Sequence, residues 1–204
     1  VRINSTGCIG SCAIGPTLIV NPDGVFYCKL KKTDVASIVK NHLLNKNVQK
    51  EFCYKDINTG EVIPFFKDID YFKSQQKIVL KNCGVIDYSD IEEFIANDGY
   101  RGLAKALSEK PDDVINEMKK SGLRGRGGGG FPTGLKWELA SKNDSDQKYV
   151  ICNADEGDPG AFMDRSLLEG DPHIVIEGMI IAGYAIGATK GVVYVRAEYP
   201  IAIE

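Results

Sequence analysis

The sequence predicts an α/β fold with a parallel sheet, and two observations carry this prediction. β-rich runs at residues 148–152 and 191–196 are separated by segments with helical periodicity, and strands that alternate with helices form parallel sheets through crossover connections. The composition, with 43% hydrophobic, 26% charged and 9% aromatic residues, is close to that of soluble globular proteins. It argues against a collagen-like, coiled-coil or disordered chain, and 204 residues are enough to bury a core.

The first 50 residues are expected to form one unit. Residues 17–20 and 25–30 are rich in β-forming side chains, and the four residues between them, Asn-Pro-Asp-Gly, are typical of a tight turn. This pattern predicts a β-hairpin. A helix is expected next, because Thr33 is a plausible N-cap and apolar residues recur at helical spacing up to Leu43. His42 lies at the end of that helix, where we expect it to pack rather than to bind a ligand.

The segment that follows lacks any periodicity. Asn58, Gly60 and Pro64 interrupt every possible helix or strand in it. We therefore expect a linker over residues 51–77. A second unit is expected from residue 78 to residue 204.

Local signals mark the helix boundaries in the second unit. Asp90 is expected to cap a helix over residues 91–96. Pro111 fits the first position of another helix, and Gly122 stands just beyond the two lysines of its last turn. The other expected elements are helices over residues 100–108, 134–142, 162–169 and 172–187, strands over residues 148–152 and 191–196, and a loop over residues 153–160.

Charge and hydropathy exclude several classes of function. With 25 basic and 28 acidic residues the net charge is −3, so the chain lacks the basic surface typical of binding to nucleic acid or to an anionic membrane. The longest apolar stretch, residues 174–188, contains Glu177 and is shorter than the roughly 20 residues that span a bilayer. We expect a buried core helix there and no direct membrane insertion. No basic segment followed by an apolar run opens the chain, which favours a cytoplasmic location.

Residues 125–130, Gly-Arg-Gly-Gly-Gly-Gly, are the most unusual segment of the chain. They match G-x-G-x-x-G formally, but a helix rather than a strand precedes them, which excludes the ordinary dinucleotide-binding fingerprint. A P-loop is excluded because Leu135 stands where that motif requires lysine. Unobstructed N–H groups, a helix start and the cations of Arg124, Arg126 and Lys136 together predict a phosphate site. A flexible surface loop is the alternative.

An acidic segment follows the first expected strand of the parallel sheet. Asn153, Asp155, Glu156 and Asp158 come directly after that strand, and ligands of open α/β sheets bind outside the carboxyl ends of strands. Carboxylates accept hydrogen bonds from sugar hydroxyls, and the asparagine amide both donates to and accepts from a heterocycle. A solvated acidic loop is the alternative.

The cysteine pattern gives a weaker indication of a metal site. Cys8 and Cys12 are spaced C-x3-C among small residues that leave room for a cluster, but two thiolates are half of the usual four ligands. The six cysteines are scattered, so a disulfide scaffold is not expected. Buried small hydrophobic side chains are the expected role of Cys28, Cys53, Cys83 and Cys152.

Four ordered motifs, at residues 122–137, 153–165, 172–178 and 194–199, closely resemble the FMN-binding subunits of NADH dehydrogenase modules. That family includes the flavin subunit of respiratory complex I and the beta subunits of NAD-dependent formate dehydrogenases and of multimeric [FeFe] hydrogenases. The resemblance implies a Rossmann-like FMN-binding domain over residues 78–204. Residues 1–50 resemble the C-terminal part of a thioredoxin-like [2Fe-2S] domain, and this fusion looks more like the hydrogenase-type beta subunit than the complex I subunit.

The resemblance also implies the site residues. It places Glu156 and Glu198 beside the reacting rings, where we expect them to be catalytic, and it makes Cys8 and Cys12 the second ligand pair of the [2Fe-2S] cluster. The implied cofactor-binding residues are Gly125, Arg126, Gly127, Gly128, Phe131, Lys136, Asn153, Asp155, Glu156, Gly157, Asp158, Tyr194 and Glu198.

The implied activity is hydride transfer between NAD(H) and FMN, followed by transfer of single electrons to iron–sulfur clusters. NADH is expected to be preferred over NADPH, because the acids around the ribose repel a 2′-phosphate. The implied partners are iron–sulfur subunits of a multisubunit hydrogenase, formate dehydrogenase or NADH dehydrogenase. His173 is expected to pack at a helix start rather than to relay protons.

We further expect the chain to be a fragment of a larger subunit. The complete protein would hold the [2Fe-2S] cluster, and a missing C-terminal region would hold a [4Fe-4S] cluster. One cysteine pair does not complete the coordination of two irons, so Cys8 and Cys12 are expected to be thiols in this chain. The alternative function is a folded fragment without cofactors that serves a structural or subunit-binding role.

Overall fold

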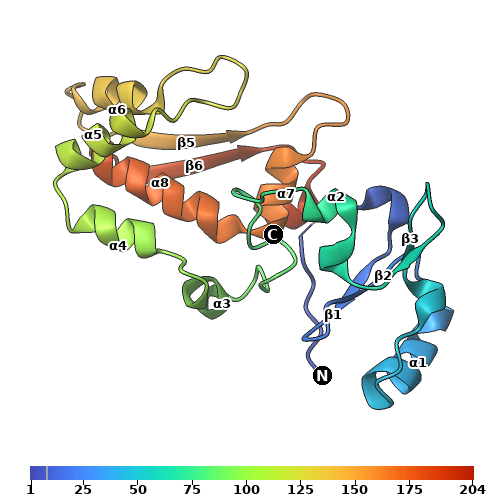
Figure 1. The fold of residues 1–204 in the computed structure, drawn as a ribbon. Coiled ribbons are helices and arrows are strands. Elements are labelled where there is room, and N and C mark those ends of the chain that lie inside the picture. Colours follow the sequence, from blue (N-terminus) through green and yellow to red (C-terminus); the bar gives the residue numbers. More distant parts are fainter. Residues whose placement is uncertain (8) are drawn as a thin grey trace. The chain divides into compact units, whose positions relative to one another are not determined.

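The chain folds as two units, described by a computed structural model of residues 1–7 and 9–204 (Figure 1). One unit is the described part of Cys8–Ile78, and the other consists of Val1–Gly7 and Val79–Glu204. Each unit has its own hydrophobic centre.

The N-terminal unit is built on the expected hairpin. Strands β1 (Leu18–Val20) and β2 (Val25–Tyr27) pair antiparallel, with Leu18 opposite Tyr27 and Val20 opposite Val25. All three residues of β2 are fully buried. A short 3-10 helix, η1 (Cys12–Ile14), precedes the hairpin. The hairpin prediction is confirmed.

The helical segment after the hairpin is wound differently from an ordinary α-helix. It consists of a 3-10 turn η2 (Lys32–Asp34), one α-turn α1 (Val35–Ser37) and a π-helix η3 (Ile38–Leu44). Thr33 lies inside η2 and does not act as the expected N-cap. A π-turn closes i→i+5 rather than i→i+4 bonds, so the buried face differs from the one that 3.6-residue spacing predicts. Ile38 and His42 are buried, whereas Val35 and Val39 are exposed.

His42 packs in this unit, as the sequence predicts. Its Nδ1 lies 2.8 Å from the Tyr27 hydroxyl, and its Nε2 lies 3.3 Å from a carboxylate oxygen of Asp23. The Tyr27 hydroxyl also accepts a hydrogen bond of 3.1 Å from the backbone N–H of Gln49. This network satisfies the polar atoms of a side chain that is 1% exposed.

Residues 51–77, expected to be a linker, instead complete the N-terminal unit. Strands β3 (Tyr54–Lys55) and β4 (Val62–Ile63) pair antiparallel, and single bridges join Tyr27 to Cys53 and Val25 to Phe65. Three short helices come from the same part of the chain: η4 (Lys50–Phe52), η5 (Phe66–Asp68) and α2 (Asp70–Lys73). Strands of two residues show no periodicity, and burial of Cys53, Ile69 and Phe72 against the hairpin holds the segment in place.

The C-terminal unit contains the predicted parallel sheet. Strands β5 (Tyr149–Ala154) and β6 (Lys190–Val195) pair in parallel along their whole length, with Tyr149 beside Lys190 and Ala154 beside Val195. Helices α7 (Met163–Gly170) and α8 (Pro172–Ile186) form the crossover between the two strands. Figure 1 shows α8 running along the sheet.

Helix α8 is the centre of this unit. It packs against both strands and against α4, α5, α6 and α7. Ala182, Gly183, Ala185 and Ile186 are buried, while Ile176 and Ile180 remain about two-fifths exposed. The prediction of a core helix therefore holds for its C-terminal half. No helix among the described residues is both long and apolar enough to cross a bilayer.

The charge that interrupts the apolar sequence of α8 has a structural role. Glu177 accepts hydrogen bonds from the backbone N–H groups of Tyr100, at 3.1 Å, and Leu103, at 3.0 Å. These groups lie at the start of helix α4 (Arg101–Leu107). His173, one turn before Glu177, stacks on the ring of Phe94 and hydrogen-bonds the Tyr100 hydroxyl at 3.0 Å. The prediction that His173 packs is confirmed.

The other helices of the unit follow the predicted boundaries closely. Asp90 caps α3 (Ile91–Ala96) by accepting hydrogen bonds from two backbone N–H groups. Helix α5 (Pro111–Ser121) begins at the predicted proline and ends before Gly122. Helix α6 (Thr133–Ser141) lies within one residue of its predicted bounds, and α9 (Pro200–Ile203), which the sequence did not predict, completes the unit. Asp171, at the start of α8, is fully buried and receives a 2.7 Å bond from the Asn82 amide.

Replacement of Gly134 by alanine is expected to destabilise the C-terminal unit. A Cβ at Gly134 would lie 2.5 Å from the backbone N and 2.7 Å from the Cα of Lys119, on the adjoining helix α5. Such overpacking costs about 1–3 kcal/mol, and urea unfolding of the chain measures it. Gly178→Ala is the matched control, because its Cβ meets no atom within 4 Å. The control should gain about 0.5–1 kcal/mol; equal stability of both variants contradicts the prediction.

Candidate functional site

The carboxyl ends of β5 and β6 bring two segments of the predicted site together. The register places Asn153 beside Tyr194, and both side chains are exposed. The acidic segment that follows β5 and residues 196–199, which follow β6, therefore start at the same edge of the sheet. Asn153 belongs to β5 rather than to the loop in which it was expected, and its Oδ1 accepts a 3.1 Å bond from the N–H of Asp155.

Glu156 occupies the N-terminal end of helix α7. Its Oε1 accepts hydrogen bonds from the backbone N–H groups of Met163, at 2.7 Å, and Asp164, at 3.1 Å, and its Oε2 accepts one from Arg165 at 3.4 Å. The Tyr199 hydroxyl donates to the same Oε2 at 3.4 Å. The carboxylate expected to act on a cofactor thus caps a helix that starts seven residues later, and it fixes the path of the acidic loop.

Arg196 joins the two segments directly. Its Nη1 donates a 2.8 Å hydrogen bond to the backbone carbonyl of Glu156, and its Nη2 donates one of 3.1 Å to Oε1 of Glu198. Tyr199 is only 4% exposed, and the guanidinium groups of Arg165 and Arg196 lie 5.4 and 5.8 Å from its ring centre. Arg196 and Tyr199 lie in one of the sequence motifs, but the sequence alone assigned them no role. Their position directly after a parallel strand was the signal that could have found them.

Several ionisable groups near this edge have shifted pKa values. Burial, and then the charge of Glu156, raise the pKa of Asp164. Burial, and then the charge of Asp164, raise the pKa of the Cys152 thiol. A backbone N–H bond and the Arg196 guanidinium lower the pKa of Glu198. Glu198 is therefore held ionised, and Cys152 is held as a neutral thiol.

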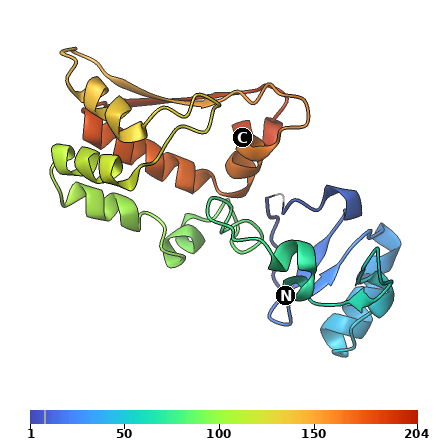
Figure 2. The same ribbon diagram turned by 45° about the horizontal axis from the view of Figure 1, so that its top comes forward.

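The glycine-rich segment forms a loop that is closed at its base and open at its tip. Arg124 and Pro132 form an antiparallel bridge, the N–H of Gly125 donates to the carbonyl of Phe131 at 2.9 Å, and Arg124 donates to the carbonyl of Gly130 at 3.0 Å. Gly128 has φ of +96°, a conformation that residues with a Cβ rarely adopt. In Figures 1 and 2 the loop extends from α5 and α6 in the direction in which β5 and β6 run.

The tip of this loop has room for a ligand. A Cβ built at Gly127, Gly128 or Gly129 meets no atom within 4 Å. Arg126 and Lys136 are exposed, and within the described residues neither pairs with a carboxylate. Phe131 is 49% exposed. Open glycines beside two cations and the start of α6 are a combination that fits a phosphate group.

The structure does not bring every predicted residue together. In the part of the chain that the structure describes, no hydrogen bond or ion pair joins the glycine loop to the acidic segment. Gly157 and Asp158 are exposed.

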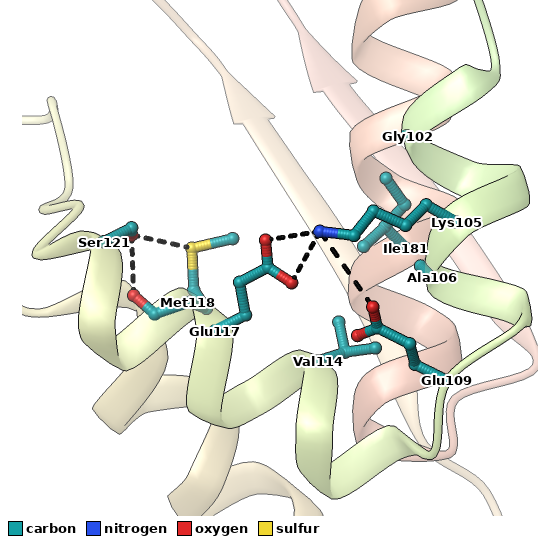
Figure 3. Close-up of a pocket in the computed structure, with 9 residues that line it drawn as sticks. All are labelled: Gly102, Lys105, Ala106, Glu109, Val114, Glu117, Met118, Ser121 and Ile181. Atoms are coloured by element: carbon teal, nitrogen blue, oxygen red, sulfur yellow. Dashed lines mark hydrogen bonds and ion pairs between the residues drawn. The ribbon is translucent and has the colours of Figure 1, made fainter.

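A groove of about 250 Å³ lies elsewhere, between α4, α5 and α8, and Lys105 crosses it (Figure 3). Its ammonium lies 2.8 Å from Glu117 and 4.0 Å from Glu109. This groove contains none of the predicted site residues.

The predicted cluster ligands are incompletely placed. Cys8 lies outside the described residues, and Cys12 is exposed at the start of η1. The described residues contain no group of three metal-ligating side chains. Cys53 and Cys83 are buried as expected, and burial raises the pKa of Cys53 to about 11. Cys28 and Cys152 are half-buried.

Comparison with known proteins shows what the C-terminal unit is similar to. Residues 118–204 match the Nuo51 FMN-binding domain. This matched segment is therefore similar to that family. It contains the glycine loop, both strands and the acidic segment, and the resemblance stated from the sequence motifs is confirmed.

Relatives come from hydrogenases and from NADH-quinone oxidoreductases. The chain is 61% identical over 132 residues to the HndC subunit of the NADP-reducing hydrogenase of Solidesulfovibrio fructosivorans, covering 65% of this chain and 27% of that protein. It is 47% identical over 130 residues to a subunit of the NADH-quinone oxidoreductase of Aquifex aeolicus, covering 64% of this chain and 30% of that protein. These relatives are subunits of oxidoreductases, and the chain spans less than a third of their length.

The fold is similar to that of a solved hydrogenase. The crystal structure of a NAD+-reducing [NiFe]-hydrogenase in the air-oxidized state matches 97% of this chain and 31% of the hydrogenase chain, with a TM-score of 0.51 and 28% identity. The match includes both units.

Asp164→Asn is expected to stabilise the C-terminal unit at neutral pH. Because burial and Glu156 raise the pKa of Asp164 above its ordinary 3.8, the folded state binds more protons than the unfolded state between those two pKa values. The free energy of unfolding therefore falls as pH rises through that window. Asparagine has no ionisable carboxyl, so it avoids this loss of stability, and the variant should have a higher free energy of unfolding than the parent at pH 7. At about pH 3.5 the Asp164 carboxyl is largely protonated in both the folded and the unfolded state, so the difference between variant and parent should disappear. Chemical unfolding at both pH values measures this. An advantage independent of pH contradicts the prediction, and Asp144→Asn, at an exposed loop position, controls for loss of one charge.

Proposed function

We propose that residues 79–204 bind FMN and a nicotinamide dinucleotide as part of the flavin subunit of a multisubunit oxidoreductase. The observation that carries this proposal is the open glycine loop between α5 and α6, within the segment that matches the Nuo51 FMN-binding domain. The names of the relatives support the reaction class, because they are subunits of NADP-reducing hydrogenase and NADH-quinone oxidoreductase.

The glycine loop is the proposed phosphate site. Gly127 and Gly128 lie at the open tip, and Gly125 closes the base of the loop by donating its N–H to the Phe131 carbonyl. Arg126 and Lys136 supply positive charge. Phe131, half exposed at the end of the loop, offers an apolar surface for the dinucleotide. Helix α6 starts at Thr133, so its positive end also favours an anion here.

The edge formed by β5 and β6 is the proposed site for the reacting rings. Asn153 and Tyr194 lie side by side there, and the Asn153 amide can both donate to and accept from a heterocycle. The exposed carboxylate of Glu198 is held ionised by Arg196, as required of an acceptor for hydroxyl or ring N–H groups. Asp155, Gly157 and Asp158 form the exposed part of the acidic loop, while Glu156 holds that loop against α7.

The flavin, when bound, supplies hydride transfer with nicotinamide and the release of single electrons. The protein residues position and orient the flavin and the dinucleotide. No general base is needed for this chemistry, and the imidazole of His173 is occupied by Phe94 and Tyr100.

The proposed partners are iron–sulfur subunits of a hydrogenase, a formate dehydrogenase or an NADH dehydrogenase, in the cytoplasm. We propose the N-terminal unit as part of a thioredoxin-like [2Fe-2S] domain, on the sequence resemblance of residues 1–50. Cys8 and Cys12 would be cluster ligands in the complete protein, and the [4Fe-4S] cluster would lie in a further region.

The competing function is a structural fragment without cofactor, and a flavin absorbance band in the purified complete subunit decides between the two.

Gly127→Val is expected to abolish FMN binding without unfolding the protein. The space around Gly127 is open and its φ lies outside the left-handed region, so valine fits the free loop but blocks a phosphate. Flavin content per subunit and thermal unfolding are measured on the same preparation. Asp144→Val, at another exposed loop position, should keep its flavin. Unchanged flavin content in Gly127→Val contradicts the phosphate site.

The complete subunit is expected to oxidise NADH faster than NADPH. The carboxylates of Asp155, Asp158 and Glu198 are exposed, and they repel a 2′-phosphate. Asp158→Ala should therefore narrow the ratio of kcat/KM for the two dinucleotides, about two- to fivefold, since one exposed charge contributes about 0.5–1 kcal/mol. Equal rates with NADPH and NADH in the unmodified protein contradict this assignment of the acids.

A further inference from the structure

We propose that Arg196 is a positioning residue for dinucleotide binding, acting through the backbone of Glu156 and the carboxylate of Glu198. This inference rests on the proposed function. Arg196 is not among the residues that the sequence resemblance implied, and it emerges from the contacts at the carboxyl ends of β5 and β6.

The geometry requires a guanidinium. Nη1 and Nη2 point to two acceptors that lie on different segments: the Glu156 carbonyl at 2.8 Å and the Glu198 carboxylate at 3.1 Å. The planar group also stacks 5.8 Å from the ring centre of buried Tyr199. A lysine ammonium at this position keeps the charge but loses the fixed pair of divergent donors.

These contacts couple two loops that the sheet alone leaves separate. Glu156 and Arg196 are 40 residues apart in sequence, and the parallel register only sets where each loop begins. The carboxylate of Glu156 anchors its loop to α7, and its carbonyl is bound by Arg196. Arg196 therefore links Glu198 to the loop that Glu156 anchors on α7. Without this link little would hold Glu198 in place, since 66% of its side-chain surface is exposed.

Charge gives Arg196 a second effect at the same edge. Asp155 and Glu198 expose two carboxylates there, and an incoming dinucleotide carries a negatively charged pyrophosphate. The Arg196 cation lies next to Glu198 and offsets part of this repulsion. Loss of its geometry should therefore weaken dinucleotide binding more than it changes the chemical step.

Arg165 provides a matched control. It also stacks on Tyr199, at 5.4 Å, but its Nε pairs with Glu169 within α7 at 3.0 Å rather than with either loop. Arg196→Lys and Arg165→Lys thus disturb the same aromatic ring, and only the first disturbs the link between the loops.

The experiment compares Arg196→Lys, Arg165→Lys and the parent in the complete subunit within its complex. Flavin content, thermal unfolding, and kcat and KM for NADH with ferricyanide as acceptor are measured. Hydrogen exchange of residues 155–161 is followed in parallel. Arg196→Lys should raise KM about tenfold, the effect of one weakened charged hydrogen bond, and should speed exchange of those amides. Its kcat and flavin content should stay within about twofold of the parent, because the variant keeps the charge, and Arg165→Lys should match the parent throughout.

A double variant tests the route through Glu198. If Arg196 acts through that carboxylate, the two substitutions remove the same interaction. The fold increase in KM of Arg196→Lys/Glu198→Gln should then be smaller than the product of the fold increases of the two single variants. Full additivity overturns the route. An unchanged KM in Arg196→Lys, an equal rise in Arg165→Lys, or loss of flavin with a lowered unfolding temperature in Arg196→Lys overturns the positioning role.

Different outcomes refute the proposed function and the role of Arg196. Absence of flavin in the parent subunit refutes the proposed function. Unchanged exchange of residues 155–161 in Arg196→Lys refutes the role of Arg196, whether or not flavin is bound.

Discussion

The parallel pairing of β5 and β6 is the constraint on which the candidate site depends. Ladder bonds along six residues of each strand fix Asn153 beside Tyr194, so both segments leave the sheet at one edge. The residues that directly follow β5 and β6 therefore lie in the same region, beyond the carboxyl ends of the two strands. Four acidic residues and Arg196 are placed there by topology, although β5 and β6 are separated by two helices in sequence.

Several acidic side chains of this unit have a structural role, because they bind the N-terminal ends of its helices. Asp90 caps α3, Glu177 binds the start of α4, Glu156 binds the start of α7, and Asp171 binds the start of α8. A cap of this kind stabilises a helix by about 0.5–2 kcal/mol, because it satisfies N–H groups that have no partner in the helix. An acid next to a strand end is therefore a candidate for a cap as well as for catalysis, and Glu156 shows the first role.

Local signals in the sequence predicted the fold of residues 79–204 well. Pro111 and Gly122 bound α5, and Asp90 caps α3, because these features depend on a few adjacent residues. The same kind of signal wrongly predicted a linker over residues 51–77, since strands of two residues carry no period and are held by distant contacts such as the bridge from Tyr27 to Cys53. The role of Glu156 was missed for the same reason: it caps a helix seven residues further along, beyond the range of any local capping pattern.

The position of the glycine loop follows from how closely two helices approach. Gly134 lets α6 pack against the backbone of α5 at Lys119, since a Cβ there would lie 2.5 Å from an atom of that backbone. The two ends of the loop are thereby fixed, and the bond from Gly125 to Phe131 closes its base. At the tip, a Cβ built at any residue from Gly127 to Gly130 meets no atom within 4 Å. A loop held at its base and open at its tip keeps its N–H groups oriented without filling the space in front of them. Binding an anion there costs less ordering entropy than binding it to a loop that is free at both ends, which supports the proposed phosphate site over the alternative of a flexible surface loop.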